Sequence, residues 1–173
     1  MSWTLIESQT LGASAASVNL GSGGTIPQTY KSLMLVISAR STQSAWSSGM
    51  YIGFNGNTST LYSNRELYGY STGAASRADT NSPGYVYAGA IPAASDTSNT
   101  FSCDQVVIPN YTTSQYKPFS CDVVDEGNTS TAYNANLWMT AGLWSSTAAV
   151  TSVQAYSSVN FTSGSTFTLY GLK

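Results

Sequence analysis

The chain has 173 residues, a formal net charge of −2, 42% hydrophobic residues and only 8% charged ones. This composition excludes a disordered chain, which combines low hydrophobicity with high net charge, and the lack of a basic run argues against a nucleic-acid partner. Histidine is absent, which removes the usual general base and the commonest metal ligand, so we expect no enzyme and no cofactor. Residues 1–5 do not resemble the start of a secretory signal, and no apolar run is long enough to span a membrane.

Short runs of alternating apolar and polar residues follow one another along the whole chain, bounded by Gly, Asn, Ser and Pro, as is typical of β-strands. The longest run, 31–40, is apolar on both faces, which predicts a central strand covered on both sides. Segments 71–84 and 92–99 are rich in small and polar residues, and we expect surface loops there. In chain order the predicted strands are 2–7, 17–20, 31–40, 50–54, 65–70, 85–91, 100–108, 116–124, 136–143, 150–156 and 166–172.

Strands at this spacing, without a run that predicts a long helix, indicate an all-β protein. We predict a single domain over 1–173, a jelly-roll-like antiparallel β-sandwich of about ten to eleven strands. Its expected core consists of Trp3, Leu5, Leu33, Leu35, Ile37, Phe54, Val106, Ile108, Val123, Leu137, Val153, Phe167 and Leu169.

The tetrapeptide Phe-Ser-Cys-Asp at 101–104 recurs at 119–122, on either side of a turn-rich segment. An antiparallel hairpin centred near Thr112 would place Cys103 and Cys121 almost opposite each other. Without a secretory signal we expect two reduced, half-buried thiols, and a disulfide bond is the alternative.

The carboxylates allow two further interpretations. Asp122, Asp125 and Glu126 form an acidic cluster, which we interpret as charges that keep a strand edge soluble, with a calcium site as the alternative. A hydrolase would need two carboxyl groups ~5–9.5 Å apart. Asp104 and Asp122 could face each other across the predicted hairpin, but like charges fit a directly opposed strand pair poorly.

Tyrosine outnumbers phenylalanine 12 to 5, and a tyrosine ring can pack while its hydroxyl stays in water. The tyrosines around segment 71–84 are interpreted as half-buried core edge, with a subunit interface or a glycan platform as alternatives. Trp46 lies in a polar loop and is the expected anchor for a partner. The candidate interface residues are Trp46, Tyr62, Tyr68, Tyr70, Tyr85 and Tyr87.

Several stretches carry a resemblance that spans nearly the whole chain: IPQTYKSL at 26–33, ISARS at 37–41, FNGN at 54–57, IPNY at 108–111, GLWSSTAAVTSV at 142–153 and FTLYGLK at 167–173. Together they resemble a family of small virion structural proteins of tailed phages, many of them marine. The chain departs from the family pattern in its two cysteines and in Pro118, neither of which bears on chemistry.

The resemblance implies a bacteriophage virion structural protein that is assembled in the host cytoplasm and has no enzymatic signature. The first expectation is a capsid decoration (cement) protein, a homo-oligomer (dimer or trimer) that binds across subunits of the major capsid protein and stabilises the shell. The alternative is a tail or tail-fibre component that binds a host surface glycan through aromatic residues at its loop ends.

Overall fold

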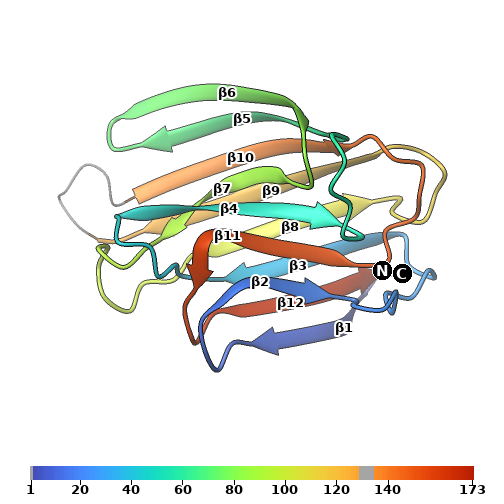
Figure 1. Ribbon diagram of the computed structural model, residues 1–173, viewed down its shortest axis with the longest axis horizontal. Helices are drawn as coiled ribbons and strands as arrows, with labels where there is room; N and C mark the ends of the chain where they lie inside the picture. Colours follow the sequence, from blue (N-terminus) through green and yellow to red (C-terminus); the bar gives the residue numbers. More distant parts are fainter. Residues whose placement is uncertain (1, 129–134) are drawn as a thin grey trace.

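The computed structural model describes residues 2–128 and 135–173, and these residues form twelve β-strands and no helix. The strands build two antiparallel sheets that pack face to face (Figure 1), which confirms the predicted all-β sandwich. Among the described residues there is accordingly no helix that could cross a membrane. The strands are β1 (Trp3–Thr10), β2 (Ala15–Leu20), β3 (Ser32–Ser38), β4 (Ser47–Phe54), β5 (Tyr62–Tyr70), β6 (Gly73–Ser82), β7 (Val86–Pro92), β8 (Cys103–Pro109), β9 (Lys117–Glu126), β10 (Ala135–Trp144), β11 (Val153–Phe161) and β12 (Thr166–Leu172).

The order of the strands is that of a jelly roll. The larger sheet has the order β1-β12-β3-β8-β9-β10-β5-β6 and the smaller one β2-β11-β4-β7. Strands β1 to β4 therefore alternate between the two sheets, and each pairs with a later strand: β1 with β12, β2 with β11, β3 with β8 and β4 with β7. Strands β5 and β6 extend the larger sheet beyond β7, the edge of the smaller one (Figure 1).

The core lies between the two sheets and is built from alternate residues of each strand. Ten of the thirteen residues expected there have exposed fractions of 0–1%, and burying a side chain of this size contributes ~1.5–3 kcal/mol to stability. The prediction is wrong for Trp3, Leu5 and Leu137, which are between 42% and 57% exposed. These three lie on the outer face of the larger sheet, because successive side chains of a strand point to opposite faces.

The prediction of a central strand covered on both sides is wrong for β3. Its inner residues Leu33, Leu35 and Ile37 are buried under the smaller sheet, whereas Val36 on the outer face is exposed. The outer face of β3 has no second sheet packed on it, so apolar residues there do not indicate burial.

The prediction of a surface loop over 71–84 is also wrong, because most of this segment is β6. Ser71 has a positive φ of 51° in the turn that joins β5 to β6, and the two strands then pair from Tyr70–Gly73 to Tyr62–Ser82. As the edge strand of the sheet, β6 is almost fully exposed. Its small, polar sequence therefore lacks the alternation by which a half-buried strand is recognised. The segment 92–99 is a loop after the end of β7, as expected, although Asp96 within it is buried.

The β8–β9 hairpin has the expected partners but a different register. Cys103 lies opposite Val124, and Cys121 lies opposite Val106, so the two cysteines are offset along the strands. Cys103 is exposed on the outer face, Cys121 is buried on the inner face, and both are free thiols. The disulfide alternative is therefore wrong, and the thiols are one exposed and one buried rather than both half-buried.

This arrangement predicts unequal effects of the two cysteines on stability. Cys121→Ser places a hydroxyl in the apolar core and should lower the free energy of unfolding by ~1–3 kcal/mol. Cys103→Ser is the matched control on the same hairpin and should leave it within ~0.5 kcal/mol of the wild type. Urea unfolding with and without a reducing agent measures both effects, and a lower midpoint of the wild type under reduction would contradict the structure.

Candidate functional site

Seven aromatic rings form a row from the smaller sheet to the overhanging part of the larger one, and all of them except the buried Trp138 are at least partly exposed. In order they are Tyr156, Tyr85, Tyr51, Tyr87, Trp138, Tyr68 and Tyr70, and their successive ring centroids are 5.8, 4.7, 5.4, 5.1, 4.0 and 5.7 Å apart. We call this row the aromatic tract. It crosses from one sheet to the other at β7, the edge strand that packs against β9 and β10.

Strand register explains why these rings meet. Tyr51 lies directly opposite Tyr87 and opposite Tyr156 on its two neighbouring strands, and Tyr68 lies opposite Trp138. Residues opposite each other in an antiparallel pair share a face of the sheet, and aromatic pairs at such positions stabilise it. The tract is thus a consequence of alternation in five strands rather than of one contiguous motif.

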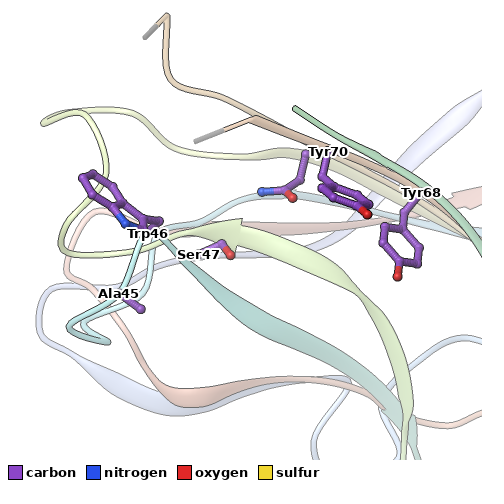
Figure 2. Close-up of a pocket in the computed structure, with 6 residues that line it drawn as sticks. Ala45, Trp46, Ser47, Tyr68 and Tyr70 are labelled. Atoms are coloured by element: carbon purple, nitrogen blue, oxygen red, sulfur yellow. The ribbon is translucent and has the colours of Figure 1, made fainter. Parts of the chain in front are cut away.

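At one end of the tract the rings border a cavity of about 380 Å³, which we call the pocket. It is lined by Ala45, Trp46, Ser47, Tyr68, Tyr70 and Asn136. Figure 2 shows Trp46 on one side and Tyr70 and Tyr68 on the other, with both tyrosine hydroxyls directed to the same side. The side chains of Trp46 and Tyr70 are 44% and 40% exposed, so the pocket presents two accessible ring systems with polar groups beside them.

The loop that carries Trp46 is held by backbone hydrogen bonds to the segment after β7. Ala93 N–H donates to the Trp46 carbonyl at 3.0 Å, and Ser95 N–H donates to the Ala45 carbonyl at 3.0 Å. A third bond joins Ala94 N–H to the Gln43 carbonyl at 2.9 Å. The backbone that carries the indole is therefore fixed before any ligand arrives, which lowers the entropy that the loop loses on binding.

Charged groups lie on the inner face of the overhang, beside the middle of the tract. Arg77 on β6 contacts Glu66 at 3.2 Å and Asp79 at 3.3 Å, and its guanidinium lies 4.5 Å from the Tyr87 ring centroid. Burial raises the pKa of Glu66 in spite of this contact with Arg77. Because two carboxyl groups face one arginine, this part of the tract has no surplus positive charge.

A second group of carboxyls is buried behind the pocket. Asn136 lies opposite Tyr70 on one side and opposite Asp125 on the other. Burial, followed by the charge of Asp96, raises the pKa of Asp125 to about 7. Burial likewise raises the pKa of Asp104 to about 8, although the Ser102 hydroxyl donates to its Oδ2 at 2.6 Å. Both side chains are held in the folded protein mainly as neutral acids at weakly acidic pH.

Alternation along β9 decides the two carboxylate interpretations. Asp122 and Glu126 are exposed on the outer face and Asp125 is buried on the inner face, so the acidic cluster does not converge, and no three metal-ligating side chains meet anywhere in 2–128 or 135–173. The calcium alternative is therefore wrong for these residues.

The same alternation excludes the carboxylate pair of a hydrolase. Asp104 lies opposite Val123, and Asp122 lies opposite Gln105. They face opposite sides of the sheet and cannot act as a catalytic pair.

Five of the six candidate interface residues lie at the site. Tyr68, Tyr70, Tyr85 and Tyr87 belong to the aromatic tract, and Trp46 faces them across the pocket. Tyr62 does not: it is buried in the core, where its hydroxyl accepts a bond from Phe54 N–H at 2.9 Å. It cannot contact a partner.

Sequence reasoning missed six residues of the site: the aromatic residues Tyr51, Tyr156 and Trp138, and the pocket residues Ala45, Ser47 and Asn136. Alternation along a predicted strand shows which of its residues share a face, as Tyr68 and Tyr70 do on β5, and so part of the tract could have been predicted. The cross-strand partners follow only from the register, which the sequence does not contain.

No protein-family model matches the chain, and comparison with the curated proteins and with the solved structures gives no match either. What the molecule binds must therefore be inferred from its own surface.

The buried carboxyls predict that stability depends on pH. In the unfolded chain the carboxyl of Asp104 has its ordinary pKa of 3.8, whereas in the folded chain the pKa is about 8. Between these two values the unfolded chain is ionised and the folded chain keeps its proton, so the free energy of unfolding falls as the pH rises from about 4 to about 8. Ionisation of Asp125 lowers the free energy of unfolding further as the pH rises from about 4 to its pKa of about 7.

We therefore expect a higher melting temperature at pH 5 than at pH 8. Asp104→Asn, which keeps a neutral side chain of the same shape, should remove a large part of this difference. Asp122→Asn, an exposed carboxyl on the neighbouring strand, is the matched control and should retain it. Melting curves followed by circular dichroism measure the effect, and equal pH dependence of the Asp104 variant and the wild type would refute it.

Proposed function

We propose that this protein is a carbohydrate-binding structural subunit of a bacteriophage particle, and that its pocket binds a glycan of the host surface. The phage origin rests on the resemblance of stretches such as 142–153 and 167–173 to virion proteins. The ligand class rests on one observation: the accessible rings of Trp46 and Tyr70 border the same pocket, next to tyrosine hydroxyls and the Asn136 amide.

Sugars match this combination of groups. The face of an aromatic ring carries partial negative charge. It therefore attracts the C–H groups on one face of a sugar ring, whose hydrogens carry partial positive charge. Sugar hydroxyls need hydrogen-bond partners when they leave water, and the hydroxyls of Tyr68 and Tyr70 lie on one side of the pocket (Figure 2). A cavity of about 380 Å³ is at the lower end of the ~300–1,000 Å³ typical of small-ligand sites.

The aromatic tract supports binding of a chain of sugars rather than a single one. Beyond the buried Trp138, the partly exposed rings of Tyr87, Tyr51 and Tyr85 continue the row over the edge of the smaller sheet. Arg77 is already matched by Glu66 and Asp79. The tract therefore favours a neutral polysaccharide over an acidic one.

Glycan binding should require Trp46 in particular and should not require an exposed tryptophan elsewhere on the surface. We expect Trp46→Ala to weaken binding to a host polysaccharide by at least about tenfold, since truncation of a hot-spot tryptophan costs about 2 kcal/mol or more and each 1.4 kcal/mol is a factor of about ten in affinity. Trp3→Ala is the matched control, because Trp3 is equally exposed but lies at the far edge of the outer face. Affinity electrophoresis in gels that contain purified host surface polysaccharide measures the difference.

Melting temperatures separate binding from folding in this experiment. Because the Trp46 side chain is exposed, its truncation should leave the melting temperature close to that of the wild type. Unchanged mobility of Trp46→Ala relative to the wild type would refute the pocket as the glycan site.

A second candidate is the capsid decoration protein that binds the major capsid protein. It is favoured by the outer face of the larger sheet, where Leu67, Leu137 and Met139 are more than half exposed, because a soluble protein rarely exposes contiguous apolar residues without a partner.

Particles that lack the protein distinguish the two candidates. If it binds host glycans, we expect such particles to keep their heat resistance and to adsorb to cells less well than the wild type, and image reconstruction should place three to a few tens of copies at the tail. Loss of heat resistance with normal adsorption, and hundreds of copies on the shell, would instead favour decoration.

A further inference from the structure

The outer face of β5, β10 and β9 carries an apolar surface that the glycan site does not use. Leu67 lies opposite Met139, and Leu137 lies opposite Val124, so these four side chains form one contiguous group, which we call the outer patch. Leu67, Leu137 and Met139 are 52–57% exposed. The patch borders a cavity of about 340 Å³, and it faces away from the pocket, because Tyr68 and Trp138 alternate with these residues on the inner face.

Two oppositely charged residues flank the outer patch. Arg65 on β5 and Asp122 on β9 both line the cavity beside Met139, with β10 between them. Within the part of the chain that the structure describes, both ion pairs involve Arg77, so neither Arg65 nor Asp122 has an ionic partner. The face is therefore polarised, positive on the β5 side and negative on the β9 side.

A second copy of the chain matches this polarity. A two-fold axis that runs along β10, midway between two facing sheets, places β5 of each copy over β9 of the other. The two Met139 side chains then meet at the centre. Arg65 lies level with Ala141 and Asp122 lies level with Met139, so Arg65 of each copy reaches the partner's Asp122 by extending along the strand over two residues, ~7 Å. A two-fold interface needs such a self-complementary surface.

The area of the face also suits a second copy. The axis along β10 pairs β9 with β5 and β8 with β6, and these five strands are 7–10 residues long. With ~3.4 Å per residue and ~4.8 Å between strands, they span a plane of roughly 750 Å². Side-chain relief increases the accessible area above this value, towards the ~800 Å² that each partner of a stable complex buries.

We propose that the outer patch is the interface of a homodimer in which two larger sheets pack back to back, with Arg65 of each copy paired to Asp122 of the other. In this dimer the two pockets face in opposite directions and remain open. Two sites on one rigid body can engage a polymeric glycan together, which raises the apparent affinity above that of a single site.

Sedimentation of the full chain over a micromolar concentration range tests the proposal. We expect a dimer for the wild type, and for Met139→Glu a dissociation constant raised at least about 100-fold, since a buried charge at the centre of an interface has no partner. Leu5→Glu is the matched control, because Leu5 is as exposed and lies on the same outer face at its opposite edge. It should leave the dimer intact.

Charge reversal tests the axis itself. Arg65→Glu and Asp122→Arg should each weaken the dimer, because like charges then face each other, and the double variant should restore it. A wild type that stays monomeric would overturn the proposal, as would a double variant no better than the single ones. A monomeric wild type that binds purified capsid shells through Met139 would also overturn it and assign the face to the major capsid protein. Because the pockets lie outside the interface, monomeric Met139→Glu should keep single-site glycan binding, so the two proposals can fail separately.

Discussion

The smaller sheet is too narrow to cover the inner face of the larger one, and this mismatch produces the overhang on which the aromatic tract ends at the pocket. Strand β7, the edge of the smaller sheet, packs against β9 and β10. The approach is so close that a Cβ at Gly89 would lie 2.8 Å from Val123 and 2.9 Å from Trp138, which excludes any larger residue there. Beyond this line β5 and β6 have no sheet above them, and aromatic side chains cover the inner face instead.

Charge is scarce in this chain, and several of its charged groups are buried. Lys117 is fully buried, where its Nζ donates to the carbonyls of Thr113 and Gln115, and burial lowers its pKa. Asp104, Asp125 and Glu66 are buried as well. What remains for the surface is mainly hydroxyl, amide and aromatic groups, the functional groups that bind neutral polar polymers better than ions.

Local sequence patterns predicted most of the strands because alternation records which side of a strand is buried. The inner residues of β3, β8 and β12 follow from it directly. The same patterns could not place β6, whose two faces are both exposed, nor identify Tyr62 as core, because its polar hydroxyl finds a backbone partner only in the folded chain. The pocket was only partly predictable: Trp46 stood out in a polar loop, but its distance from Tyr70 depends on how two sheets of unequal width stack.

The position of β6 at the free edge of the larger sheet bears on how the protein behaves at high local concentration. An exposed edge strand invites the edge of another molecule to extend its hydrogen-bond ladder, which leads to ribbons and fibrils. Here Arg77 and Asp79 stand in the middle of that strand, and bringing a second edge alongside would strip water from both. The segment whose sequence predicted a surface loop thus caps the sheet, and it keeps molecules at high local concentration from polymerising side by side.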